Sequence, residues 1–122
     1  MKLKYALTGL LVLYLVAMFM LAILPHLGFI KGVSENDKIL HLTEFFVFTI
    51  LLIATLSFYD IKDMYLIATV SVLSIILISE LIQIPVVGRT FSLQDIIADM
   101  TGSAAAFFVM FLARLRWKSS KQ

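Results

Sequence analysis

The sequence predicts an all-α membrane protein: a bundle of four transmembrane helices in a single domain, residues 1–122. The first observation is composition, since 61% of the residues are hydrophobic, 15% are charged and the mean hydropathy is +1.03. A soluble domain of this length has too small an interior to bury so much apolar surface. The second observation is that the apolar residues fall into four runs of roughly 20 residues, the length that a helix needs to cross a bilayer. The runs are apolar on all sides, unlike the alternating strands of a membrane barrel, so we expect helices.

The expected spans, in order, cover about residues 5–24, 37–58, 64–84 and 95–115. The first ends at Pro25, and we expect it to be retained, because the residues around Pro25 lack the small-residue pattern of a signal-peptide cleavage site. The second follows three N-cap candidates, Ser34, Asn36 and Asp37. The third stops at Pro85. Ser92 and Asp95 form an S-x-x-D pattern before the fourth, which is close to a capping box.

Lysine and arginine are distributed unevenly between the two sides of this predicted bundle. With four spans both termini lie on one side, which then holds Lys2, Lys4, Lys62, Arg114, Arg116, Lys118 and Lys121. The other side holds only Lys31, Lys38 and Arg89. Basic residues are enriched in cytoplasmic loops, so we expect both termini in the cytoplasm. The C-terminal basic residues are then topology anchors, and a net charge of +2 without a basic, aromatic-lined face argues against a nucleic-acid partner.

The remaining charged residues gather toward the extracytoplasmic ends of the spans. They form three stripes at helical spacing: Asp37, His41 and Glu44; Glu80 and Gln83; and Asp95, Asp99 and Gly102. At ~1.5 Å per residue, Glu44, Glu80 and Asp99 all lie about 6–10 Å below the ends of their helices. Carboxylates that face lipid are costly, so we expect the three stripes to face one another. Small residues from Gly102 to Ala106 give the fourth span a surface for close approach, whereas the first span is expected to be a plain wall or anchor.

The charges of this polar set do not cancel. Five acids, Asp37, Glu44, Glu80, Asp95 and Asp99, accompany Lys38, Arg89 and His41, which leaves an excess of two negative charges even with His41 protonated. Such an excess in a low-dielectric site calls for protonated carboxyls, a metal, a cationic ligand or water. Individually, Asp37 and Asp95 also suit helix caps, His41 and Gln83 suit interhelical hydrogen bonds, and Arg89 suits a phosphate headgroup.

These residues resemble the VanZ-like family of small bacterial membrane proteins. The resemblance covers about residues 37–106 and rests on an ordered series of motifs with helix-length gaps: Asp37-Lys38-x-x-His41, Glu44, Glu80-x-x-Gln83, Gly88-Arg89, Asp95-x-x-x-Asp99 and Gly102. Asp99 stands where the family more often has Asn, and Pro85 lies farther from Gly88 than in the usual pattern. The resemblance implies a bacterial cytoplasmic-membrane protein associated with resistance to glycopeptides of the teicoplanin type, which carry a lipid tail. It implies no chemical mechanism, so function has to be argued from the site.

Two functions are compatible with the polar set. The first is binding of an amphiphile at the outer leaflet, a lipid headgroup or a lipoglycopeptide, by Asp37, Lys38, His41, Glu44, Glu80, Gln83, Arg89, Asp95 and Asp99. The alternative is a membrane-embedded hydrolase or transferase for lipid-linked cell-envelope substrates, with catalytic or metal-ligating candidates His41, Glu44, Glu80 and Asp99. H-x-x-E is a loose metal pattern, the chain has no cysteine, and no cofactor is indicated.

Ion transport is disfavoured because the cytoplasmic halves of spans two to four lack ionisable residues. The sequence is compatible with both a monomer and a homo-oligomer.

Overall fold

The computed structural model describes residues 2–24 and 33–120, and for residues 33–36 and 118 it describes the backbone only. In this part of the chain there are four helices and no strand: α1 (Lys2–Ile23), α2 (Val33–Ser57), α3 (Met64–Gln83) and α4 (Leu93–Ser119). All four are long and apolar enough to cross a membrane. The four predicted helices are therefore confirmed. Pro25 and the segment that follows it, through Gly32, lie outside the described residues.

Two helix starts differ from the expected ones. α2 begins at Val33, so Ser34, Asn36 and Asp37 lie inside the helix, and the prediction that one of them caps it was wrong. The start of an apolar run marks where the chain enters the hydrocarbon core of the membrane. The helix itself can begin several polar residues before that point. α4 begins at Leu93, directly after Ser92, so Asp95 lies in the first turn rather than at the cap.

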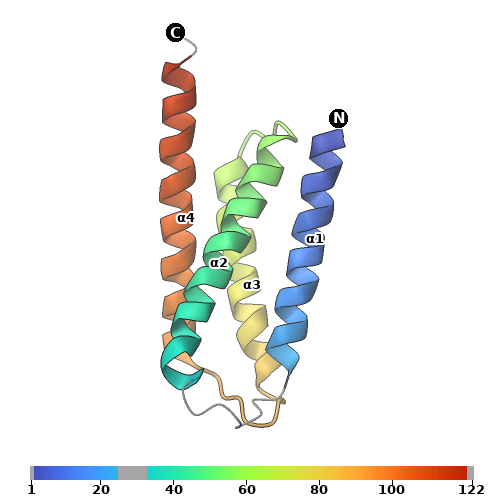
Figure 1. Ribbon diagram of the computed structural model, residues 1–122, viewed down its shortest axis with the longest axis vertical. Helices are drawn as coiled ribbons and strands as arrows, with labels where there is room; N and C mark the ends of the chain where they lie inside the picture. Colours follow the sequence, from blue (N-terminus) through green and yellow to red (C-terminus); the bar gives the residue numbers. More distant parts are fainter. Residues whose placement is uncertain (1, 25–32, 121–122) are drawn as a thin grey trace.

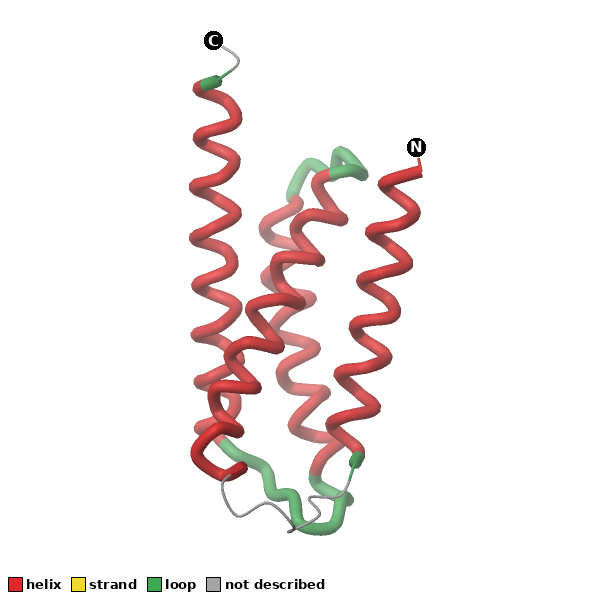
Figure 2. Tube along the Cα trace, in the orientation of Figure 1, coloured by secondary structure: helices red, strands yellow, loops and turns green. Residues whose placement is uncertain are grey.

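The helices are antiparallel to their neighbours along the chain, as Figure 1 shows. The beginning of α1 and the end of α4 lie at one end of the bundle, together with the turn between α2 and α3. The end of α1, the described beginning of α2 and the loop between α3 and α4 lie at the opposite end (Figure 2). α2 packs against all three other helices, most extensively against α4, whereas the described parts of α1 and α4 do not touch.

The apolar core lies between α2 and α3. Its fully buried side chains include Phe45, Phe48 and Ile53 of α2 and Ile76 of α3, and the rings of Phe45 and Phe48 meet edge to face with centroids 5.9 Å apart. α1 contributes only Met18 and Ala22 as buried residues. Most other apolar side chains are exposed, as expected for helices that face lipid rather than water. α1 is therefore a peripheral helix that packs against the outside of the core with few buried side chains.

The contact between α2 and α4 depends on small residues of α4. Gly102, Ser103 and Ala106 are all buried. A Cβ atom on Gly102 would collide with the backbone carbonyl of Leu42, so only glycine permits this approach. The predicted small-residue surface, from Gly102 to Ala106, is confirmed only in part, because Ala104 and Ala105 are exposed. Asp99 lies one turn before Gly102, and the close approach therefore brings it against α2.

Candidate functional site

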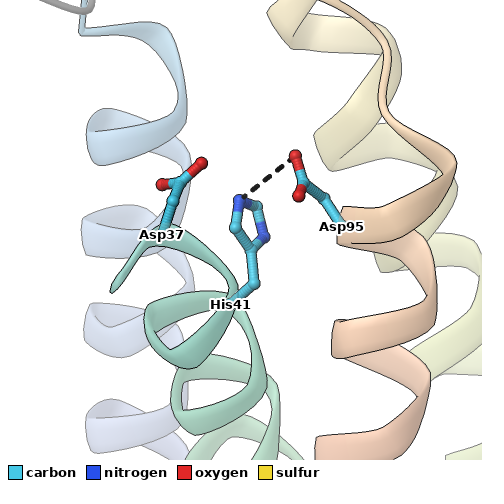
Figure 3. A group of neighbouring side chains, drawn as sticks. All are labelled: Asp37, His41 and Asp95. Atoms are coloured by element: carbon cyan, nitrogen blue, oxygen red, sulfur yellow. Dashed lines mark ion pairs between the residues drawn. The ribbon is translucent and has the colours of Figure 1, made fainter. Parts of the chain in front are cut away.

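His41 of α2 and Asp99 of α4 form the centre of a buried polar cluster. His41 Nδ1 and Asp99 Oδ1 are 3.0 Å apart, and Asp99 is completely buried. The other ring nitrogen, Nε2, lies 3.9 Å from Asp95 Oδ2. Figure 3 shows the ring between Asp37, on its own helix, and Asp95, on α4. The i, i+4 spacing of Asp37 and His41, and of Asp95 and Asp99, places each pair on one face of its helix.

Glu80 joins α3 to the beginning of α4. Its side chain is completely buried, and its Oε2 accepts the backbone N–H of Ser92 at 3.0 Å. Ser92 Oγ in turn accepts the backbone N–H of Asp95 at 3.2 Å, so Ser92 caps α4. In a capping box the residue at the Asp95 position also accepts the N–H of the cap residue. Here Glu80 accepts it instead, and the Asp95 carboxylate turns toward His41.

Two carboxylate oxygens in this cluster lack partners. Glu80 Oε1 and Asp99 Oδ2 are buried and make no hydrogen bond to any described residue. Buried polar atoms are normally satisfied, so such atoms mark a site where a ligand, an ion, a proton or water is expected. The donor atoms of His41, Glu80 and Asp99 lie within 4.8 Å of one another, and so do those of Asp37, His41 and Asp95. We refer to these five residues, Asp37, His41, Glu80, Asp95 and Asp99, as the acidic cluster.

The two fixed cations of the predicted set do not neutralise the acidic cluster. Arg89 donates instead to neutral oxygens: Gln83 Oε1 at 3.1 Å, and the carbonyls of Leu21 at 3.3 Å and Leu24 at 3.4 Å. Lys38 is exposed on α2. In the described part of the chain, His41 is the only basic residue that lies within ion-pair distance of a carboxylate. Even with His41 protonated, the four acids of the cluster leave an excess of three negative charges if all are ionised.

A hollow of about 460 Å³ lies beside the cluster, between α1, α2 and α3; we call it the α1 hollow. Five of its lining residues carry charged, imidazole or amide side chains, and we call this group its polar end: Asp37, His41, Glu44, Gln83 and Arg89. The rest is mainly apolar and comes largely from α1, including Ala17, Met18, Phe19 and Leu21. Tyr14 of α1 also lines it and donates its hydroxyl to the Glu44 carbonyl at 3.0 Å. Asp37 and His41 therefore belong to both the acidic cluster and the α1 hollow.

The structure divides the predicted polar set into two groups. Glu80, Asp95 and Asp99 converge on His41, whereas Glu44, Gln83 and Arg89 line the α1 hollow. Glu44 is not part of either group of donor atoms that lie within 4.8 Å. Lys38 lines neither the hollow nor the cluster.

Sequence reasoning missed the contribution of α1. Tyr14, most of the apolar residues of the hollow and the Leu21 carbonyl lie on α1, and Leu24 follows that helix directly. After Lys4, α1 carries no Asp, Glu, His, Lys or Arg. Nothing in its composition distinguishes a residue that lines a hollow from one that faces lipid. The capping role of Ser92 was visible in the sequence, but the participation of Glu80 was not, because it depends on how α3 meets α4.

No family model, curated protein or solved structure matches this chain. Its function therefore has to be argued from the site itself, because the same helical architecture serves many functions. The site offers two separate chemistries: a hollow with one polar end and one apolar wall, and a buried cluster with more negative charge than its own residues balance.

Proposed function

We propose that this chain is a VanZ-like protein of the bacterial cytoplasmic membrane that binds amphiphilic ligands at the outer leaflet through the α1 hollow. The ligands are lipid headgroups with their chains, or lipoglycopeptides of the teicoplanin type, and capture or masking of such ligands contributes to antibiotic resistance or envelope homeostasis. The observation that carries the proposal is the composition of the hollow, which combines the side chains of its polar end with an apolar lining that comes largely from α1.

The hollow has the dimensions and lining of a small-molecule site. Its volume of about 460 Å³ lies within the range of ligand pockets. Such pockets are mostly apolar with a few convergent polar groups, which is the pattern here. An acyl chain suits the wall formed by Met18 and Phe19, and a headgroup suits the end formed by Glu44, Gln83 and Arg89.

The polar end can recognise both charges of a zwitterionic or mixed headgroup. Arg89 uses three of its five N–H groups on Gln83, Leu21 and Leu24. Among the described residues the other two have no acceptor, so they can bind a phosphate or carboxylate oxygen. Glu44 and Asp37, which also line this end, supply carboxylates for an amine. An amphiphile with both an anionic and a cationic group is the ligand class that would use both the Arg89 guanidinium and these two carboxylates.

The expected orientation supports access from outside the cell. The end of the bundle opposite the polar residues carries Lys4, Arg114 and Arg116 on its described helices, and basic residues favour the cytoplasmic side. The polar end of the α1 hollow then lies at the outer leaflet.

Drug susceptibility tests the proposal in cells that lack the protein or express one of its variants. Glu44→Gln removes a charge from the polar end, and Ala17→Trp fills the apolar wall. Val16→Trp is the matched control, because Val16 neighbours Ala17 on α1 but is exposed and does not line the hollow. We expect the parent and Val16→Trp to lower susceptibility to teicoplanin, and the other two variants to lose that effect. Equal susceptibility in all strains, at equal expression, would show that the hollow does not capture this drug.

Mass spectrometry of co-purified lipids tests whether the hollow binds a membrane lipid, independently of any binding of a lipoglycopeptide. We expect a defined lipid to accompany the parent protein and Val16→Trp in mild detergent, and to be depleted from Ala17→Trp. The same lipid profile in all three would contradict binding of lipid in the hollow.

A further inference from the structure

We propose that Asp37, His41 and Asp95 bind a divalent transition-metal ion, with Asp99 as the residue that orients His41. The inference concerns the acidic cluster and does not depend on what occupies the α1 hollow. It rests on the placement of the His41 ring, on its hydrogen bond to Asp99 and on the unbalanced charge around it.

The three proposed ligands present their donor atoms to one point. One donor atom each from Asp37, His41 and Asp95 lies within 4.8 Å of the other two. Figure 3 shows one ring nitrogen of His41 directed between the two carboxylates, which come from different helices. Bonds of about 2.0–2.2 Å from zinc to nitrogen or oxygen place neighbouring ligand atoms ~3–4 Å apart, so the cluster has to contract only slightly around an ion.

His41 Nε2 is the group whose surroundings call for a ligand. The side chain of His41 is 9% exposed, and Nε2 makes no hydrogen bond within the described residues, since Asp95 Oδ2 is 3.9 Å away. On a side chain that is about nine-tenths buried, such a ring nitrogen is either a donor without a protein acceptor or a lone pair without a protein partner. A cation between Asp37 and Asp95 satisfies the lone pair.

Asp99 fixes which nitrogen carries the proton. It is completely buried, and its Oδ1 lies 3.0 Å from His41 Nδ1, so the carboxylate accepts the Nδ1–H and leaves the Nε2 lone pair facing Asp37 and Asp95. Histidines that bind metals almost always donate their other ring N–H to a carboxylate or carbonyl, which orients the ring and raises its basicity. Asp99 is therefore a positioning residue rather than a ligand.

The charge of the cluster also favours a cation. Four carboxylates surround one imidazole, while Arg89 bonds neutral oxygens elsewhere. A divalent ion removes two of the excess negative charges in a place where water is largely excluded. One imidazole with carboxylate oxygens suits Zn²⁺ or Mn²⁺, whereas Mg²⁺ and Ca²⁺ prefer oxygen ligands alone. Asp37 is only partly buried, which gives the ion a route from the aqueous side.

The second group of nearby donors, His41 with Glu80 and Asp99, is the weaker candidate. Asp99 Oδ1 already pairs with His41 Nδ1, and Glu80 Oε2 already accepts the Ser92 N–H. An ion held by His41 Nδ1 would replace the hydrogen bond between His41 and Asp99, whereas an ion at Nε2 preserves it. Zinc binding by Glu80→Gln and by Asp95→Asn distinguishes the two positions.

The test is metal binding to the full-length protein, purified in detergent and stripped with a chelator. Zn²⁺ and Mn²⁺ are titrated with calorimetry and with thermal unfolding as the readouts, and Mg²⁺ and Ca²⁺ serve as comparison ions. We expect one Zn²⁺ per chain and a higher unfolding temperature on binding. Asp37→Asn and Asp95→Asn should each weaken Zn²⁺ binding by about tenfold or more.

Asp60→Asn is the matched control. It makes the same chemical change at the opposite end of the bundle, and asparagine tolerates the positive φ of 52° found there. It should bind Zn²⁺ as the parent does. Asp99→Asn retains an oxygen that accepts the Nδ1–H and should bind more tightly than Asp99→Leu.

Three results would overturn the proposal. The first is no saturable binding of Zn²⁺ or Mn²⁺ by the parent. The second is equal affinity in the parent, Asp37→Asn and Asp95→Asn. The third is loss of binding in Glu80→Gln but not in Asp95→Asn, which places the ion in the other group. Circular dichroism of each variant shows whether it is folded, and two separate ligand variants keep the test informative if one fails to fold.

Discussion

Glu80 acts at the residue scale as a cap for a helix other than its own. It lies on α3, yet its carboxylate accepts the N–H of the residue that precedes α4. This bond frees Asp95 to face His41 and ties the loop after α3 to the protein interior. A single buried side chain thus links the ends of two helices to the geometry of the acidic cluster.

Replacement of Glu80 separates this hydrogen-bonding role from its charge. Glu80→Gln keeps a carbonyl oxygen for the Ser92 N–H and offers an N–H₂ group to the unpartnered oxygen of a neighbouring acid. Glu80→Ala leaves the Ser92 N–H unsatisfied. We therefore expect Glu80→Ala to be less stable than Glu80→Gln by about 1–3 kcal/mol, measured by unfolding in mixed micelles. Equal stability of the two variants would contradict the capping role.

Arg89 holds the peripheral helix against the bundle. Its guanidinium donates to two carbonyls in the last turn of α1 and just beyond it, and to Gln83 on α3. A lysine ammonium cannot reproduce three donors in a fixed plane. We expect Arg89→Lys to lower the free energy of unfolding by about 1.5–3 kcal/mol, the range for hydrogen bonds to charged groups.

Arg116→Lys is the control for Arg89→Lys. Arg116 is exposed near the end of α4, so the same exchange there should leave stability unchanged. If both exchanges have the same effect, the contacts of Arg89 with α1 do not stabilise the bundle.

At the scale of elements, the contact between α2 and α4 depends on one glycine. The backbone of α2 at Leu42 approaches Gly102 so closely that a methyl group has no space. Gly102→Ala should push the two helices apart, lower the unfolding temperature and disturb the His41–Asp99 hydrogen bond one turn away. Gly9→Ala in α1 is the matched control, because no atom lies within 4 Å of the Cβ that it adds. The unfolding temperatures of both variants, measured in the same detergent, test the role of Gly102. Similar losses of stability in Gly102→Ala and Gly9→Ala would contradict it.

The sequence was sufficient for the four helices and for the polar faces of α2, α3 and α4, because hydrophobic length and helical spacing carry that information directly. It was insufficient for α1, since Leu21 and Phe19 have the same apolar character whether they face lipid or a hollow. From the sequence we also expected Glu44 close to Glu80 and Asp99, whereas Glu44 belongs to neither group of donor atoms that lie within 4.8 Å of one another. The depth of a side chain in the membrane does not fix the rotation of its helix. Two of the three partners of Arg89 were unpredictable for another reason: they are backbone carbonyls, which every residue has.

At the scale of the whole molecule, the two ends of the bundle differ in chemistry. The end with the acidic cluster is rich in carboxylates and connects to the α1 hollow. The other end pairs basic groups with aromatic rings: Lys4 lies 3.8 Å from the centre of the Tyr59 ring, and Arg114 lies 5.7 Å from that of Tyr65. Basic and aromatic residues anchor helices at membrane interfaces, and basic residues favour the cytoplasm. This polarity is the physical basis for the expected orientation.

The orientation can be measured directly, because the chain contains no cysteine and every introduced thiol is unique. Val87, 82% exposed in the loop between α3 and α4, lies at the acidic end, and Ser120 follows α4 at the basic end. Neither substitution removes a basic residue, so the charge bias that sets topology is unchanged. A maleimide that cannot cross membranes should label Val87→Cys in intact cells and Ser120→Cys only after lysis. The opposite pattern would place the α1 hollow on the cytoplasmic side, where it could not capture a ligand that arrives from outside the cell.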